Sequence, residues 1–188
     1  MNNPQYIFSM YKMSKVYPGG KQVLKDISLS FLPGAKIGVL GGNGAGKSTL
    51  LKIMAGIDNE FNGDAKLADG IKVGYLAQEP ELDNNLNVYE NVMEGMSEAK
   101  CLVDEFNLIS LKFSEDLTDE EMNETISKQG ELQEKIDNMD AWDLDRKAEI
   151  AMDALSLPSG DSNITNLSGG EKRRVALAQL LLSNPDFL

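Results

Sequence analysis

The 188-residue chain contains no histidine and a single cysteine, Cys101. Without histidine it cannot build a Ser-His-Asp triad, a Cys-His nucleophile pair or a histidine-ligated zinc site. With one cysteine it cannot close an intrachain disulfide, which is typical of proteins in a reducing compartment. These absences exclude several common hydrolase mechanisms and predict a cytoplasmic location.

The chain also lacks long apolar runs and a basic surplus. No run approaches the roughly 18 apolar residues of a membrane-spanning helix, and residues 1–5 have neither the basic nor the apolar region of a leader. We therefore expect no membrane association. The 18 Lys and Arg against 30 Asp and Glu give a net charge of −12, which excludes a broad basic face for nucleic acid. A hydrophobic content of 41% is enough for one sizeable domain, or for a domain with an insertion.

The first part of the chain has the alternating pattern of β-strands. Apolar residues bounded by Pro-Gly turns predict short strands over residues 6–13, 27–31, 36–40, 65–67 and 71–76. The run over 36–40 is typical of a strand buried in a sheet. The apolar spacing over 47–55 predicts a helix that Gly56 closes.

A glycine-rich loop lies between the strand predicted over 36–40 and this helix. Its residues satisfy G-x-x-x-x-G-K-[ST] and are Gly41, Gly42, Asn43, Gly44, Ala45, Gly46, Lys47, Ser48 and Thr49. Glycines let backbone N–H groups wrap a phosphate chain, and the helix dipole favours the same anion. Lys47 is expected to reach the β- and γ-phosphates and Ser48 to coordinate Mg²⁺. A plain glycine-rich turn is the alternative, but its place between strand and helix favours ATP binding.

The pattern becomes helical after Pro80. Apolar residues step by three and four over 102–113, and Thr118 begins a second helix through a capping box. The apolar stripe that we expect on this second helix comprises Met122, Ile126, Leu132, Ile136 and Met139. We interpret residues 97–141 as an inserted helical hairpin, followed by a third helix over 144–155.

A second glycine motif follows Leu167 and comprises Ser168, Gly169, Gly170 and Glu171. Ser168 and Glu171 have capping-box spacing, so the motif begins a helix. A serine and two glycines at a helix N-terminus also expose N–H groups to an anion. The two interpretations are compatible. The basic run 172–174 that follows could contact RNA, although charges on a helix surface are more often solvated or paired.

The glycine-rich loop followed by L-S-G-G-E resembles the ATP-binding-cassette ATPases. This resemblance implies an α/β P-loop fold with an N-terminal antiparallel β subdomain, and a signature at 168–171 that binds the γ-phosphate of ATP on a facing cassette. Tyr17 resembles the aromatic residue that stacks on adenine, although it could be an ordinary edge-strand tyrosine. Gln78 resembles the Q-loop glutamine, which contacts Mg²⁺ and the attacking water. With Lys47, it is the candidate catalytic residue.

The spacing favours one branch of the family. Gln78 and Ser168 are 90 residues apart, more than in a typical transporter cassette, and the extra length coincides with the hairpin. The hairpin resembles the arm of ABC-F proteins, as do Glu171 after the signature glycines and the local sequences over 27–41 and 71–80. We therefore divide the chain into a cassette at 1–96, an arm at 97–141 and an incomplete helical subdomain at 142–188.

The ABC-F resemblance implies a ribosome-associated translation factor that uses ATP and Mg²⁺ and pairs with a second cassette of the same chain. It would occupy the ribosomal E site beside the P-site tRNA, with the arm near the L1 stalk. It would gate the transition into elongation according to the ATP/ADP balance, and hydrolysis would release it. The alternatives are an ATPase subunit of a membrane transporter and a non-enzymatic nucleotide-binding or interaction module.

The charge of the arm restricts its partner. Residues 96–141 contain 13 acidic residues and four lysines, Lys100, Lys112, Lys128 and Lys135. A net charge of −9 repels RNA phosphates within a Debye length of about 8 Å. We therefore expect few phosphate contacts and a basic ribosomal protein as partner. A solvated hairpin without a partner is the alternative.

Several cassette elements are missing from the 188 residues. After Pro185 we find no apolar Walker B strand ending in Asp-Glu, no D-loop and no switch histidine. We interpret the chain as an N-terminal part of a longer protein, truncated before the Walker B strand. We expect these residues to bind ATP weakly and not to hydrolyse it at a useful rate.

Overall fold

The computed structural model describes residues 6–188, in which the chain forms two compact units. Residues 1–5, for which the sequence indicates no leader, lie outside the described residues. The first unit contains the chain up to Tyr75 together with Asn184–Leu188, and the second contains Leu76–Ser183. The predicted division of the chain at residues 97 and 142 stays a prediction. In the structure, the hairpin helices and the helices on either side of them belong to one compact unit.

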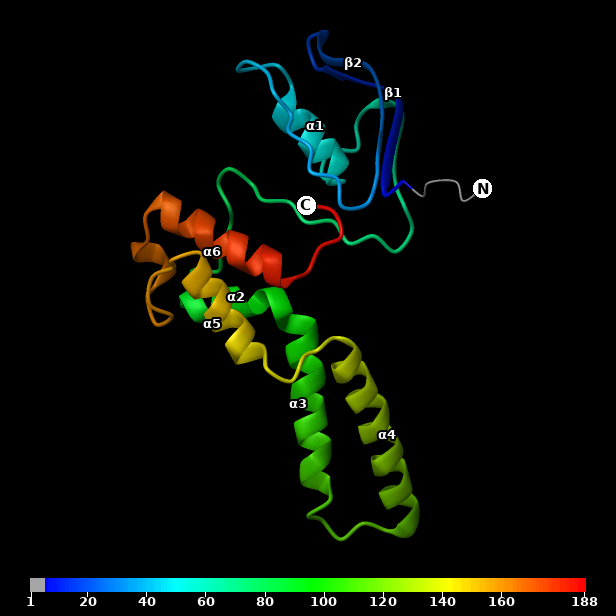
Figure 1. The fold of residues 1–188 in the computed structure, drawn as a ribbon, viewed down its shortest axis with the longest axis vertical. Coiled ribbons are helices and arrows are strands. Elements are labelled where there is room, and N and C mark those ends of the chain that lie inside the picture. The colour runs from blue at the N-terminus through cyan, green and yellow to red at the C-terminus, as the bar shows by residue number, and fades with distance from the viewer. Residues whose placement is uncertain (1–5) are drawn as a thin grey trace. The chain divides into compact units, whose positions relative to one another are not determined.

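The first unit is a three-stranded antiparallel sheet covered by one helix (Figure 1). The elements are β1 (Phe8–Tyr17), β2 (Lys21–Phe31), α1 (Lys47–Met54) and β3 (Asn62–Leu67), and the strand order is β2-β1-β3. Met10 and Met13 of β1 are both buried in one core with Leu50 and Ile53 of α1, because the register of β1 shifts between the two methionines. Gly56 ends the helix in a left-handed conformation with φ 71°, as predicted.

Two of the predicted strands do not form as expected. Residues 36–40 adopt no strand, and Leu40 is 95% exposed. A buried parallel strand needs hydrogen-bonded neighbours, and within residues 6–188 no strand pairs with this segment. The strand expected over 71–76 is reduced to one parallel bridge between Val73 and Phe187. Phe187 also stacks on Phe8 with ring centroids 5.7 Å apart, which ties the 184–188 segment to the sheet.

The second unit is helical. Its elements are α2 (Val88–Met93), the 3₁₀ turn η1 (Glu94–Met96), α3 (Ser97–Lys112), α4 (Asp119–Asn138), α5 (Leu144–Ala154), the 3₁₀ turn η2 (Ile164–Asn166) and α6 (Gly169–Leu182). The capping box predicted at Thr118 is present, because its side chain accepts from the backbone N–H of Glu121. The core joins α2, α5 and α6 around Val92, Ala148 and Val175, each fully buried.

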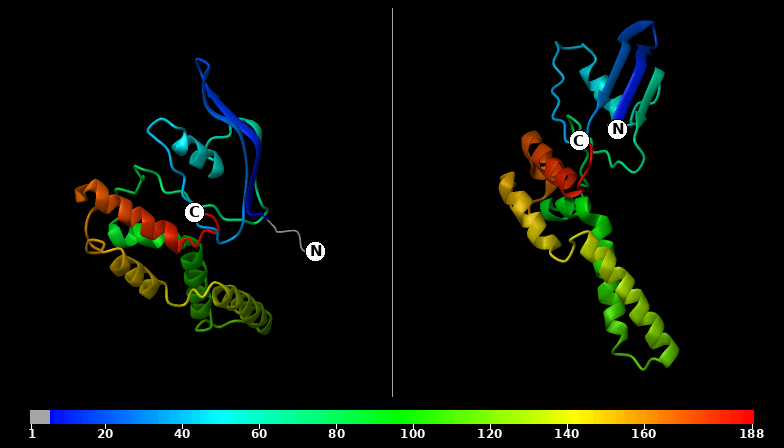
Figure 2. Two further views of the ribbon diagram at one scale, coloured as in Figure 1. Left: turned by 45° about the horizontal axis from the view of Figure 1, so that its top comes forward. Right: turned by 45° about the vertical axis from the view of Figure 1, so that its right-hand side comes forward.

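Helices α3 and α4 lie side by side as an antiparallel hairpin (Figure 2). Leu132 and Ile136 of α4 are buried as predicted, but Ile126 is 53% exposed. The six-residue step from Ile126 to Leu132 rotates about 240° around a helix, which carries Ile126 off the buried stripe. At the base of the hairpin, Trp142 packs edge-on against Phe106 with ring centroids 5.1 Å apart. None of the helices within residues 6–188 is both long and apolar enough to cross a membrane.

Gly95 determines how closely η1 approaches α6. A Cβ at this position would overlap the backbone carbonyl of Gln179. Because a helix backbone cannot move aside as a flexible side chain can, only glycine allows this packing.

We predict that Gly95→Ala lowers the free energy of unfolding by about 1–3 kcal/mol, through overpacking against α6. Gly130 is the matched control, since it lies within α4 and a Cβ there would meet nothing within 4 Å. Gly130→Ala should raise stability by about 0.5–1 kcal/mol. Urea unfolding followed by circular dichroism measures both, and equal effects of the two substitutions would contradict this packing argument.

Candidate nucleotide-binding site

The glycine-rich loop begins α1, as the pattern predicted. Gly46 is the N-cap of α1 with φ 90°, and Gly44 is also left-handed with φ 77°. A Cβ on Gly46 would lie 2.8 Å from side-chain atoms of both Val23 and Leu24 on β2. The loop therefore lies directly against β2, and glycine is required at this position both for its backbone conformation and for space.

The ammonium of Lys47 lies over its own loop. Its Nζ donates to the carbonyl oxygens of Gly41 and Gly42, each at 2.8 Å. Residues 41–45 are exposed, and the N-terminus of α1 has no side-chain cap. The first N–H groups of an uncapped helix need a partner, and an anion satisfies them together with the nearby ammonium.

The residues fit a nucleoside triphosphate with Mg²⁺. The Ser48 hydroxyl, at the second position of α1, is a hard oxygen donor of the kind that Mg²⁺ accepts when phosphates complete its shell. Within residues 6–188, no group of three or more Asp, Glu, His or Cys side chains could hold a metal.

Tyr17 is the last residue of β1 and lies beside the start of α1. Its hydroxyl is 3.1 Å from Oγ1 of Thr49. Strand β1 is the central strand of the sheet, not an edge strand, although β3 pairs with it only as far as Ser14. The side chain is 39% exposed, so one part of it remains open to a ligand. The structure thus places Tyr17 and the loop in one unit, as a stacking role requires.

Lys15 is a neighbour of Tyr17 to which sequence reasoning gave no role. It is 3% exposed, and its Nζ donates to Oδ1 of Asp58 at 2.8 Å. This hydrogen bond is the main cause that holds the pKa of Asp58 below its usual value, against an opposing effect of burial. A lysine between Ser14 and Val16 in a strand gives little signal in a sequence. Its partner Asp58 lies in the loop after α1, 43 residues further along the chain.

Gln78 and the signature share the second unit. The backbone carbonyl of Gln78 accepts from Nε of Arg173 in α6 at 2.6 Å. Buried Asn91 holds the loop that leads from Gln78 to α2, donating to the carbonyls of Asp83 and Asn87. Arg173 is therefore paired, which was one of the states expected for the basic run, but the sequence did not indicate the backbone of Gln78 as its partner.

The signature begins α6 with the predicted capping box. The Ser168 side chain accepts from the backbone N–H of Glu171 at 3.3 Å, and its hydroxyl donates to Oε2 of Glu171 at 2.7 Å. The carboxylate also accepts from the backbone N–H of Ser168 at 2.8 Å. These two hydrogen bonds hold the pKa of Glu171 below its usual value, and the one from the Ser168 hydroxyl has the larger effect. Gly169 and Gly170 are the first two residues of α6, and a Cβ on either would meet nothing within 4 Å, so the space around them is open.

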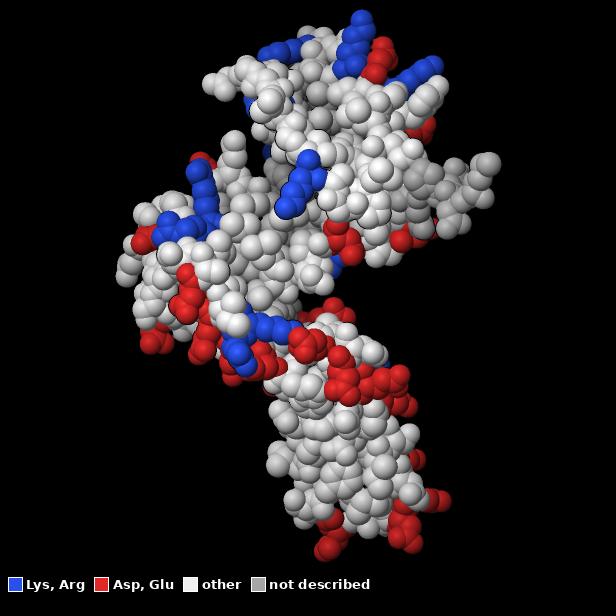
Figure 3. All heavy atoms as spheres, in the orientation of Figure 1, with Lys and Arg blue, Asp and Glu red and all other residues white. Residues whose placement is uncertain are grey.

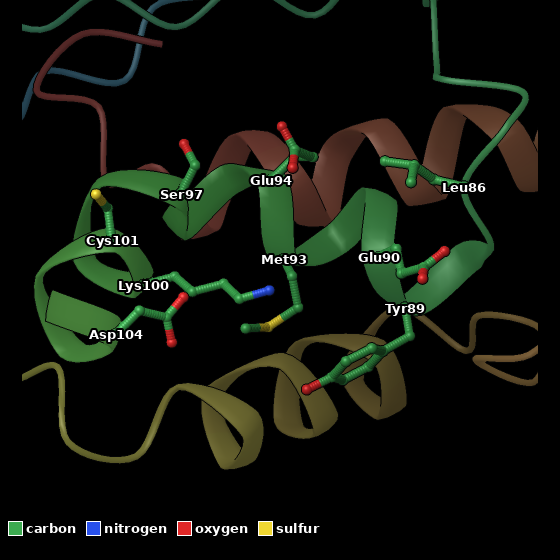
Figure 4. Close-up of a pocket in the computed structure, with 9 residues that line it drawn as sticks. All are labelled: Leu86, Tyr89, Glu90, Met93, Glu94, Ser97, Lys100, Cys101 and Asp104. Atoms are coloured by element: carbon green, nitrogen blue, oxygen red, sulfur yellow. The ribbon is translucent and has the colours of Figure 1, made fainter. Parts of the chain in front are cut away.

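A separate pocket of about 380 Å³ lies along α2, η1 and the start of α3 (Figure 4). It contains none of the predicted site residues. Lys100 reaches across it toward Met93, with Asp104 and Tyr89 at its rim. The hydrogen bond that Tyr89 donates to Asp145 at 2.5 Å, with burial, raises the pKa of Tyr89 to about 12. This hydrogen bond joins α2 to α5 beside the pocket.

A sequence model of the family described as ABC transporter matches residues 24–188. The chain belongs to the ABC transporter family, whose members are ATP-binding cassettes. The solved structure of cbiO1 from Clostridium perfringens, part of the ABC transporter complex cbiONQ, has a TM-score of 0.53 at 23% identity. That match covers 96% of this chain and 62% of the solved chain. The predicted family and the predicted α/β cassette fold are thereby confirmed.

Within this family the chain is similar to translation proteins. It is 54% identical over 184 residues to the energy-dependent translational throttle protein EttA of Mycobacterium tuberculosis, covering 98% of this chain and 32% of the relative. EttA of Escherichia coli K12 is 47% identical, with 98% and 33% covered. The chain spans about a third of the length of these curated relatives.

The ion pair of Lys15 and Asp58 makes stability pH-dependent in a defined direction. Because the folded-state pKa of Asp58 lies below the usual 3.8, the pair stabilises the fold fully above that value. The stabilisation is lost as the pH falls through the lowered folded-state pKa. We predict that Asp58→Asn lowers the free energy of unfolding by about 1–3 kcal/mol at pH 7, and that the gap to wild type shrinks below pH 4.

Denaturant unfolding between pH 7 and pH 3 measures this gap. Glu60→Gln is the control, since Glu60 is 3.8 Å from the same ammonium but its side chain is 95% exposed. Its effect at pH 7 should stay within about 0.5 kcal/mol. A gap for Asp58→Asn that widens toward low pH would contradict the sign of this linkage.

Proposed function

We propose that this chain binds ATP with Mg²⁺ as the first cassette of a ribosome-associated, translation-regulating ATPase. The observation that carries the proposal is the loop at 41–49, which begins α1 without a side-chain cap beneath the ammonium of Lys47. Backbone N–H groups, a helix N-terminus and a lysine together form a triphosphate site.

Each residue of the site has a defined task in this proposal. Backbone N–H groups over 41–47 hold the phosphate oxygens, while Lys47 exchanges its carbonyl contacts for the β- and γ-phosphates. Ser48 holds Mg²⁺, which neutralises phosphate charge when bound. Tyr17 stacks on the base, with its hydroxyl kept near Thr49. Gln78 contacts the metal and the attacking water, and its backbone is held to α6 by Arg173.

The signature at 168–171 acts on a second nucleotide. In a cassette pair it faces the γ-phosphate bound to the other cassette, where the N-terminus of α6 stabilises the anion. The Ser168 hydroxyl donates to Glu171 at 2.7 Å, so phosphate binding must compete with an internal carboxylate. We propose that hydrolysis takes place between two such cassettes and opens them.

The similarity to EttA supports a role on the ribosome. We propose that the protein acts at the E site beside the P-site tRNA and gates the transition into elongation according to the ATP/ADP balance, with hydrolysis driving release. A transporter subunit is the alternative. The identities of 47–54% to translational throttle proteins favour translation, whereas the transporter structure, at 23% identity, supports the fold alone.

The arm is the proposed contact with the translation machinery. On the face shown in Figure 3, acidic side chains gather at the tip and at the base of the α3–α4 hairpin. Within the arm, the structure pairs Lys128 with Glu105 at 2.8 Å, which takes one of its four lysines away from RNA. We propose that a basic ribosomal protein near the L1 stalk, and not RNA phosphate, is the main partner of the arm.

We predict that the 188 residues alone show no ATP turnover above background, because they contain no Walker B Asp-Glu pair to position water. A phosphate-release assay tests this, with Lys47→Ala as the matched variant. Equal, near-zero rates for the two proteins are expected. Turnover that Lys47→Ala abolishes would contradict our account of the hydrolytic site.

We predict that reversing the charge of the arm weakens ribosome binding at least tenfold, and more strongly at low salt. The variant changes three glutamates of α4 to lysine: Glu120, Glu124 and Glu131. All three are exposed, and none forms an ion pair within residues 6–188. Co-sedimentation of the full-length protein with ribosomes, under ATP and under ADP, measures the effect.

The control reverses three exposed acidic residues of the same unit outside the arm: Glu149, Asp153 and Asp161. It has the same net charge as the arm variant and should bind ribosomes at near wild-type strength. Unchanged affinity of the arm variant would support a solvated hairpin without a partner. Tighter binding of the arm variant would indicate RNA phosphate as the partner.

A further inference from the structure

A buried lysine lies beneath the tyrosine that we propose for base stacking. Lys15 and Tyr17 are two residues apart in β1, and Nζ of Lys15 lies over the Tyr17 ring, so the two side chains lie on the same side of the strand. That face also holds the buried Met13. Lys15 is 3% exposed while Tyr17 is 39% exposed, so the lysine lies inside and the ring lies at the surface above it.

The contacts of Lys15 fix it in place. Its Nζ is 2.8 Å from Oδ1 of Asp58 and 3.8 Å from Oε2 of Glu60. Oδ1 of Asp58 also accepts from the backbone N–H of Glu60 at 3.0 Å, so the loop after α1 is folded around the ammonium. The same Nζ lies 5.3 Å from the centroid of the Tyr17 ring, within the range of a cation–π contact.

The Tyr17 ring is therefore held at two points. Lys15 occupies one face of the ring, and the hydroxyl is 3.1 Å from Oγ1 of Thr49, in the first turn of α1. A ring held in this way keeps its opposite face available to a flat partner. The hydroxyl contact also links the orientation of the ring to the helix that begins at the phosphate loop.

Burying a lysine opposes folding unless its charge is compensated, and apolar residues of similar volume often serve stability as well. A reason other than stability is therefore expected for Lys15. Its position against the inner face of Tyr17 supplies one. The cation prevents the ring from collapsing into the sheet and orders it before a base arrives.

We propose that Lys15 is a positioning residue for the nucleotide base: it supports the inner face of Tyr17, so that the outer face is pre-ordered to stack on a purine. This inference rests on the proposed nucleotide site and adds a specificity role to it. It requires that Lys15 contribute to the affinity for ATP but not to the affinity for a triphosphate that has no base.

The test compares ATP with inorganic tripolyphosphate by titration calorimetry in the presence of Mg²⁺. Lys15→Met should weaken ATP binding by about threefold to tenfold, the size of an aromatic or cation–π contact, and should leave tripolyphosphate binding unchanged. Lys15→Arg, which keeps the cation, should restore the ATP preference.

The chain offers a matched control on the same strand. Nζ of Lys12 also lies 5.3 Å from a tyrosine ring, that of Tyr11, but Lys12 is exposed and forms no ion pair with Asp58. Lys12→Met should change neither affinity. In a Tyr17→Leu background, Lys15→Met should have no further effect on ATP binding, because the two residues act through one contact.

Folding is checked by circular dichroism. Where Lys15→Met alone unfolds, the double substitution Lys15→Met with Asp58→Asn removes the orphaned carboxylate and gives the comparison instead. Equal losses for ATP and tripolyphosphate, or no loss in a folded variant, would overturn the inference and leave the proposed ATP site standing. A wild-type chain that binds neither compound would overturn the proposed function and the inference with it.

Discussion

The close approach of Gly46 to β2 is the contact on which the proposed nucleotide site depends. Because a side chain at this position would meet Val23 and Leu24 at 2.8 Å, the loop can lie flat against the strand only with glycine there. That contact fixes where α1 begins. It thereby fixes the direction of the helix N-terminus and the place of Lys47, so backbone conformation and anion binding have a common origin.

Strand β1 adds a second constraint to the same helix. Tyr17 reaches the first turn of α1 through Thr49, and Lys15 reaches the loop after its last turn through Asp58. The central strand is thus tied to both ends of an eight-residue helix. The proposed base site and the proposed phosphate site are therefore parts of one packed unit. In the second unit, Arg173 similarly links the backbone of Gln78 to α6.

Local signals in the sequence were sufficient for much of this structure. The phosphate loop, the hairpin helices and the capping boxes at Thr118 and Ser168 each depend on residues close together in the chain. The errors arose where distant partners decide the outcome. Ile126 is a local exception, because the six-residue step to Leu132 carries it off the buried stripe of α4. The apolar run over 36–40 has the composition of a strand but no pairing neighbour within residues 6–188. Lys15 and Arg173 were missed for the same reason, because their partners are 43 and 95 residues away.

The central claim is that the loop over 41–49 is an ATP site. Titration calorimetry of ATP and Mg²⁺ into the wild-type chain and into Lys47→Ala tests it most directly. The account predicts one ATP per chain and an affinity at least tenfold lower for Lys47→Ala, since the ammonium is lost from the phosphates. No binding to the wild type, or equal binding to both proteins, would contradict it.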